Sequence, residues 1–154
     1  MFIFADIGNK ITFLNMDKNG PIIIIEDDQD DQEILRMVFK KLAYSNEVIY
    51  FNDGVEALVY LENLNIKPFL ILSDINMPKL NGMELRDKIF NNERINLRCI
   101  PYLFFTTASE QPMVLKAYSK SVQGFFVKPA GFNEIENTIS LIMQYWKKCH
   151  SPDL

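Results

Sequence analysis

The stretch LILSDINMPKLNG, residues 70–82, is an apolar run that stops at a serine and an aspartate and continues into a Met-Pro segment and an Asn-Gly turn. Its apolar part has the length and composition of a buried strand. Asp74 therefore stands at the carboxyl end of that strand, where an aspartate can cap a turn or a helix. Whether Asp74 has only this structural role depends on what the rest of the chain brings beside it.

Short apolar runs alternate with amphipathic stretches from Pro21 onward. The predicted strands are residues 21–26, 47–51, 68–73, 100–106 and 124–128, and the predicted helices are residues 31–44, 53–64, 82–92, 109–120 and 131–148. A polar connection, residues 91–99, precedes the fourth strand, and Asp53 and Ser109 are the predicted N-caps of the second and fourth helices. This alternation predicts an α/β fold, a doubly wound, five-stranded parallel sheet with helices on both faces.

The chain has 154 residues, of which 48% are apolar, enough to fill one core of ordinary size. We predict that residues 1–20 are an N-terminal appendage, residues 21–148 the folded domain and residues 149–154 a tail. The appendage is expected to be a loosely held tail. The alternative is an extra strand or a dimer arm built on Ile11, Phe13 and Leu14.

Charge and composition exclude several classes of partner. A net charge of −4 argues against broad binding to nucleic acid or to an anionic membrane. No apolar run reaches the roughly 18 residues that a membrane helix needs, and the first residues make a poor secretory signal. Cys99 and Cys149 form neither a metal-ligand motif nor a disulfide framework, which favours a reducing, cytoplasmic location.

Polar side chains stand at the carboxyl ends of the predicted strands. Glu26 and Asp27 follow the first strand, Asp74 the third and Thr107 the fourth, and Lys128 ends the fifth. Sites in open parallel sheets form outside these strand ends, where the strand order reverses. If the order, numbered along the chain, is 2-1-3-4-5, the five residues meet there. A capping role for Asp74 does not explain this convergence.

Three carboxylates at one edge repel one another unless a raised pKa or a bound cation relieves the charge. Oxygen ligands from few residues favour Mg²⁺. Mg²⁺ and Lys128 could neutralise a transferring phosphoryl group, and a carboxylate in line with it could be the nucleophile. Asp74 is the best candidate because it stands alone, whereas Glu26 and Asp27 are adjacent and can share the metal. Three further acids are expected at the start of the first helix, where its dipole favours them: Asp28, Asp30 and Asp31.

Four stretches together resemble the receiver domain of two-component response regulators, the CheY-like family. They are IIIIEDD (22–28), LILSDINMPKLNGMEL (70–85), FFTTAS (104–109) and GFFVKPA (124–130). The resemblance covers about residues 21–148 and implies a flavodoxin-like, three-layer sandwich.

The resemblance implies that Asp74 is the phospho-acceptor, which takes a phosphoryl group from a histidine kinase or a phosphotransfer protein. Asp27, Asp74 and the backbone carbonyl of Asn76 would bind Mg²⁺, and Glu26 would act mainly through metal-bound water. Lys128 would hold a phosphoryl oxygen.

Three further residues have implied roles in switching. Thr107 and the backbone N–H of Ala108 would hydrogen-bond the phosphoryl group, and the rotamer of Phe125 would follow Thr107. The bond between Lys128 and Pro129 would be cis.

Some positions depart from the commonest family pattern. Phe125 stands where tyrosine is frequent, and Asn76 and Ser109 occupy positions that tune phosphoaspartate hydrolysis in the family. The long connection at residues 91–99 and the helix ending MQYWKK resemble the small regulators that serve bacterial phytochrome-type kinases.

The expected function is that of a stand-alone response regulator, not an enzyme beyond its own phosphorylation and dephosphorylation. It would signal to a downstream protein target through the face made by the fourth helix, fifth strand and fifth helix. Leu141 and Tyr145 could form a partner or homodimer surface there, or could be ordinary exposed apolar residues.

Two other functions stay open from the residues, and a third, a flavodoxin-like cofactor binder, is disfavoured because an acidic pocket repels an anionic group. One is a receiver-like binding module that works without phosphorylation. The other is a phosphatase of the haloacid-dehalogenase type. That enzyme would need its nucleophile after the first strand and an acidic pair late in the chain, where only Glu134, Glu136 and Asp153 follow Lys128.

Overall fold

A five-stranded parallel sheet forms the centre of the computed structural model, which describes residues 4–7, 10–13, 17–96 and 99–150. Its strands are β3 (Ile22–Ile25), β4 (Val48–Phe51), β5 (Leu70–Ser73), β6 (Tyr102–Thr106) and β7 (Gly124–Val127), in the order β4-β3-β5-β6-β7. Numbered from Pro21, this is the order 2-1-3-4-5. In the centre, Ile22 pairs with Val48 on one side and Leu70 on the other. The predicted fold is confirmed.

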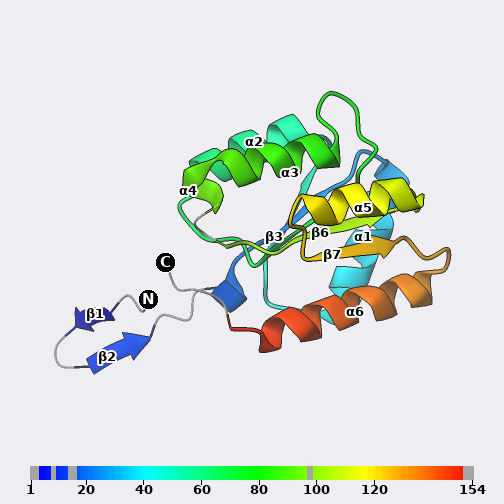
Figure 1. Cartoon of the computed structure of the whole chain (residues 1–154). Helices are drawn as coiled ribbons and strands as arrows, with labels where there is room; N and C mark the ends of the chain where they lie inside the picture. The colour runs from blue at the N-terminus through cyan, green and yellow to red at the C-terminus, as the bar shows by residue number, and fades with distance from the viewer. Residues whose placement is uncertain (1–3, 8–9, 14–16, 97–98, 151–154) are drawn as a thin grey trace.

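Helices cover both faces of the sheet (Figure 1). One face carries α2 (Gly54–Asn63), α3 (Gly82–Asn91) and α5 (Gln111–Ser119), and the other carries α1 (Gln29–Leu42) and α6 (Phe132–Lys148). Successive side chains of β3 alternate between the two cores. Ile23 and Ile25 pack on the side of α2 and α3, and Ile22 and Ile24 on the side of α1 and α6. A strand buried on both faces is apolar at every position, which explains the run of four isoleucines.

The helix starts follow the predicted caps at one position and depart from them at another. Asp53 caps α2, and its side chain accepts from the N–H groups of Val55 and Glu56. Ser109, however, does not cap α5, which begins at Gln111 after Glu110 without a side-chain cap. The prediction for Ser109 is wrong because Pro112 stands in the first turn, and a proline is tolerated only at a helix start.

The connection predicted as polar contains a short helix, α4 (Glu93–Asn96). Ile95, which this turn carries, is 1% exposed and packs in the core beneath α2 and α3. The side chain of Asn92 accepts a hydrogen bond from the N–H of Ile95 at 3.2 Å. A single buried isoleucine among polar residues is too weak a periodic signal to predict a helix.

Two strands precede the central sheet along the chain. β1 (Phe4–Ile7) and β2 (Lys10–Phe13) pair as an antiparallel two-stranded sheet, followed by η1 (Asp17–Asn19). Figure 1 shows this pair away from the central sheet. Ile11 and Phe13 thus lie in a strand, whereas Leu14 lies outside the described residues. Within the described part of the chain, none of the helices combines the length and apolar character needed to cross a bilayer.

Candidate functional site

Adjacent strand ends bring the predicted acidic residues together. Ile25 and Ser73 are partners in the parallel pairing of β3 and β5, so the residues that follow them leave the sheet side by side. The N–H of Asp74 donates to the carbonyl of Ile25 at 2.9 Å, which extends the pairing by one residue. Glu26 and Asp27 follow Ile25 directly. The position of all three carboxylates is therefore a consequence of strand order.

The three acids present one oxygen each within 4.8 Å of one another. Glu26 is 2% exposed and Asp74 is 9% exposed, whereas Asp27 faces solvent. An all-oxygen donor set with a solvent-facing side fits Mg²⁺, a hard cation that keeps several of its waters. The arrangement has the chemistry of a small divalent cation site.

Lys128 reaches the same acids from the end of β7. Its N–H extends the β6–β7 pairing by donating to the carbonyl of Thr106 at 2.8 Å. Its Nζ contacts Glu26 Oε2 and lies 2.7 Å from Asp31 Oδ2 and 3.3 Å from Asp74 Oδ2. The side chain of Lys128 is 8% exposed, so the ammonium is largely removed from water among carboxylates.

Burial and pairing act in opposite directions on these groups. Removal from water raises the pKa of Glu26 to about 7, although the hydrogen bond and charge of Lys128 lower it. Burial lowers the pKa of Lys128, but its hydrogen bonds to Asp31 and Glu26 and the nearby charges outweigh that effect and leave the pKa raised. Lys128 is therefore charged at neutral pH, and burial makes Glu26 harder to ionise than an exposed glutamate.

The backbone around Asp74 is held closely. The N–H of Ile75 donates to Asp74 Oδ1 at 2.7 Å, and the hydroxyl of Ser73 donates to the carbonyl of Asp74 at 2.7 Å. Gly82, where α3 begins, packs so tightly that an added Cβ would lie 2.1 Å from the carbonyl oxygen of Asp74. Asn76 is exposed in the loop between Asp74 and Gly82. That its carbonyl binds Mg²⁺ stays a prediction.

The predicted switch residues lie on the neighbouring strands. Thr107 follows β6, is exposed, and lines a cavity of about 330 Å³ together with Asp31 and Lys128. The N–H of Ala108 donates to the side chain of Thr106 at 3.3 Å. The ring of Phe125, on β7, lies 6.1 Å from the ring of Phe104 and is partly buried.

The peptide bond between Lys128 and Pro129 is trans, because no cis bond occurs among the described residues. The prediction of a cis bond is wrong. Lys128 reaches Asp74 and Glu26 without it.

Sequence reasoning missed two residues of α1. Asp31 was assigned only to the helix dipole, yet its carboxylate contacts Lys128. Gln32 is buried, and its Nε2 donates to the carbonyl of Glu26 at 2.5 Å and to Asn52 Oδ1 at 2.8 Å, which ties α1 to two strand ends. A signal for Asp31 existed: it stands four residues before Leu35 and seven before Val38, both buried, so helical spacing turns it toward the sheet.

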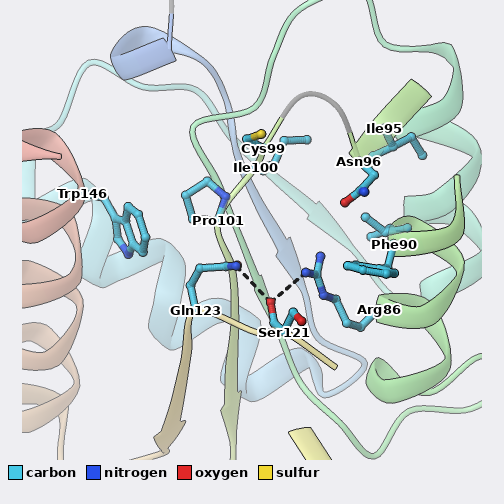
Figure 2. Close-up of a pocket in the computed structure, with 11 residues that line it drawn as sticks. Arg86, Phe90, Ile95, Asn96, Cys99, Ile100, Pro101, Ser121, Gln123 and Trp146 are labelled. Atoms are coloured by element: carbon cyan, nitrogen blue, oxygen red, sulfur yellow. Dashed lines mark hydrogen bonds between the residues drawn. The ribbon is translucent and has the colours of Figure 1, made fainter. Parts of the chain in front are cut away.

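A second cavity, of about 280 Å³, lies at the opposite end of the sheet, near the start of β6 and β7. Figure 2 shows Arg86 and Gln123 both directed at Ser121. Arg86 donates to the carbonyls of Lys120 and Ser121, at 3.0 and 2.8 Å, and Gln123 Nε2 donates to the carbonyl of Ser121 at 3.0 Å. Gln123 Oε1 also accepts from the N–H of Tyr102 at 2.7 Å. These hydrogen bonds hold the segment before β7 against α3 and the start of β6.

Comparison with known proteins identifies the family. The sequence model of the response regulator receiver domain family matches residues 22–140. The chain belongs to this family. It is a receiver domain of two-component signalling, with the CheY-like fold, as the sequence motifs predicted. Receiver domains bind Mg²⁺ at an acidic pocket, and the cluster of Glu26, Asp27 and Asp74 fits such a pocket.

Two curated relatives match over most of their own length. The probable methanogenesis regulatory protein FilR2 of Methanothrix harundinacea is 30% identical over 129 residues, which cover 81% of this chain and 82% of FilR2. The response regulator Rcp1 of Synechocystis is 27% identical over 138 residues, which cover 84% of this chain and 92% of Rcp1. The rice response regulator-like protein PRR73 is also 30% identical, but the chain spans only 16% of its length.

Solved structures of phytochrome response regulators share the fold. The phosphorylated cyanobacterial phytochrome response regulator RcpA superposes with a TM-score of 0.78 at 25% identity, covering 86% of this chain and 98% of RcpA. The Mn²⁺-bound form of Rcp1 superposes with a TM-score of 0.75 at 26% identity, covering 85% of this chain and 97% of Rcp1. The narrower resemblance to regulators of phytochrome-type kinases is thus confirmed.

Proposed function

We propose that Asp74 accepts a phosphoryl group from the phosphohistidine of a sensor histidine kinase or a phosphotransfer protein. The observation that carries this proposal is the convergence at one sheet edge of the Asp74 carboxylate, two further acids and the Lys128 ammonium, which lies 3.3 Å from Asp74. Receiver domains act with such partners, and the phosphorylated RcpA and Mn²⁺-bound Rcp1 structures support the same chemistry here.

The transfer is a displacement at phosphorus. A carboxylate oxygen of Asp74 forms the new P–O bond as the P–N bond to the histidine breaks, and the imidazole leaves with the electron pair. The N–H of Ile75 orients the Asp74 carboxylate, and Lys128 is placed to neutralise a phosphoryl oxygen.

The metal ligands of the proposal are the side chains of Asp27 and Asp74 and the carbonyl of Asn76, with Glu26 acting mainly through metal-bound water. Mg²⁺, when bound, supplies charge neutralisation for the phosphoryl oxygens. The chain's own contribution is to hold these oxygens at two adjacent strand ends.

Phosphorylation would change the surface formed by α5, β7 and α6, and a partner would recognise that change. Thr107 and the N–H of Ala108 bind the phosphoryl group, and Phe125 turns further inward as Thr107 moves. This face already presents large exposed apolar side chains: Leu115, Tyr118, Val127, Leu141 and Tyr145. A downstream protein target or a second copy of the chain would dock there.

Residues 21–148 would form the receiver unit, with residues 1–20 as an appendage and 149–154 as a tail. The chain would catalyse only its own phosphorylation and dephosphorylation.

Dimerisation is tested by the mass in solution with and without beryllofluoride, and a monomer under both conditions would exclude it.

The test is incubation with acetyl phosphate and Mg²⁺, followed by intact-mass measurement and assay of released phosphate. We expect one phosphoryl adduct that disappears in Asp74→Asn and persists in Asp30→Asn, which removes an exposed acid outside the site. Turnover of many phosphoesters would indicate a phosphatase instead. The absence of any adduct would favour a binding module that needs no phosphorylation.

A further inference from the structure

The ammonium of Lys128 has three N–H donors and three carboxylate partners, so every donor is engaged. These partners are not equivalent. Asp31 Oδ2 lies 2.7 Å from Nζ, whereas Asp74 Oδ2 lies at 3.3 Å, near the limit for a hydrogen bond. Lys128 is therefore held more closely by Asp31 than by Asp74, the proposed phosphoryl acceptor.

Asp31 also differs from the other two partners in its surroundings. Glu26 and Asp74 belong to the candidate cation cluster, and Asp31 does not. Its side chain is 37% exposed, against 3% for Glu26 and 11% for Asp74. Glu26 and Asp74 would share their charge with a bound cation, which weakens their hold on the ammonium. The contact with Asp31 is the one that a cation does not compete for.

The position of Asp31 is set by the helix that carries it. The side chain of Asp28 caps α1 and accepts from the N–H groups of Asp30 and Asp31. Leu35 and Val38, on the same face of the helix, are buried in the core. Asp31 thus reaches Lys128 from a fixed backbone, and it lines the same cavity as Lys128 and Thr107.

We propose that Asp31 is a positioning residue, whose carboxylate holds the Lys128 ammonium in place while Glu26 and Asp74 engage the cation and the phosphoryl group. This inference rests on the proposed phosphorylation of Asp74. The simpler role, favourable charge at the N-terminus of α1, belongs equally to Asp30, which stands in the same turn and has no contact with Lys128 among the described interactions.

Asp30 therefore provides the matched control. Asp31→Asn and Asp30→Asn remove the same charge from the same helix turn, but only the first replaces the ion pair with Lys128 by a weaker contact to a neutral amide oxygen. With acetyl phosphate, the maximal rate constant of phosphorylation should fall about fivefold in Asp31→Asn and change less than about twofold in Asp30→Asn. Half-saturating Mg²⁺ should be the same in both variants, because neither residue is a proposed ligand. Equal rate constants in the two variants would overturn the proposal.

A spectroscopic measurement on the metal-free protein tests the contact without phosphorylation. A buried, ion-paired ammonium exchanges its protons slowly enough for its ¹H–¹⁵N signal to be observed, and Lys128→Arg assigns that signal. We expect the signal to broaden or shift in Asp31→Asn, to persist in Asp30→Asn and to recover in part in Asp31→Glu, which can restore the ion pair. An unchanged signal in Asp31→Asn would refute the positioning role. A wild-type protein that forms no adduct but shows these signal changes would instead refute the phosphorylation of Asp74, and with it any role of Asp31 in transfer.

Discussion

Two buried cations lie at opposite ends of the sheet, and their partners differ in kind. Lys128, at the carboxyl end, contacts three carboxylates. Arg86, at the amino end, is 5% exposed and donates to the backbone carbonyls of Lys120 and Ser121. Its guanidinium carbon also lies 5.4 Å from the ring centre of Tyr102. In the described part of the chain, no ion pair of Arg86 with a carboxylate is found.

The partners of Arg86 are neutral backbone groups, whereas the partners of Lys128 are carboxylates that can also bind a ligand. Backbone carbonyls are neutral and fixed by the loop that carries them, so the hydrogen bonds of Arg86 hold the segment before β7 against α3. Carboxylates can bind a metal cation or accept a proton, and either event weakens their attraction for the ammonium. The contacts of Lys128 can therefore change when a ligand binds. A buried charge is therefore no sign of function by itself. A buried charge whose partners can bind a cation or a proton is a better one.

The largest expected effect comes from replacing each cation with methionine, an unbranched apolar residue. Lys128→Met should lower the phosphorylation rate by about 100-fold or more, since it removes a charge aimed at the transferring group, and should leave the fold in place. Arg86→Met should leave phosphorylation nearly unchanged but lower the free energy of unfolding by about 2–3 kcal/mol, because the carbonyls of Lys120 and Ser121 lose the hydrogen bonds from Arg86 and only Ser121 keeps another donor, Gln123. Acetyl phosphate kinetics and urea unfolding measure the two effects. The reverse assignment of effects would contradict the comparison.

A smaller effect is expected where the backbone approaches the acceptor. Gly82→Ala places a Cβ 2.1 Å from the carbonyl oxygen of Asp74, so the loop after Asp74 must shift. We expect a loss of about 2 kcal/mol in unfolding free energy and slower phosphorylation. Gly131→Ala is the control, since an added Cβ there meets nothing within 4 Å. Thermal unfolding and phosphorylation of the two variants measure the difference, and equal behaviour would show that the close approach is unimportant.

The smallest effect concerns the proton on Glu26, whose pKa burial raises to about 7. A cation competes with this proton, so Mg²⁺ affinity should rise from pH 6 to pH 8 by about tenfold or less, as expected for one displaced proton. Because the folded pKa lies above the unfolded value of 4.5, the metal-free fold should lose stability as pH rises from about 4.5 to about 7 and should lose no more from this group above that pH.

Calorimetric titration with Mg²⁺ and thermal unfolding in a chelator measure these two trends. Glu26→Gln cannot ionise and should remove both of them. A Mg²⁺ affinity that rises equally with pH in Glu26→Gln and in the wild type would assign the proton to another group.

The sequence predicted the fold and the five strand-end residues because both depend on local signals. Apolar runs specify buried strands, and in a parallel sheet every strand end comes to the same edge. Strand order then decides which ends are neighbours; the alternation of elements left it as a condition, the receiver resemblance implied the order 2-1-3-4-5, and the structure confirms it. The partners of Lys128 could be predicted only in part, because Asp31 and Gln32 reach the site from a helix whose rotation depends on core packing.

By itself, the sequence determined the alternation of strands and helices and the side chains available at each strand end. Tertiary structure decided which of them interact: that Asp31 takes a donor of Lys128, that Ile95 turns a polar connection into a helix, and that Gly82 must lack a side chain beside Asp74. The physical reason is range. Hydrophobic periodicity and turn chemistry act within a few residues, whereas packing and charge pairing are settled between segments far apart along the chain.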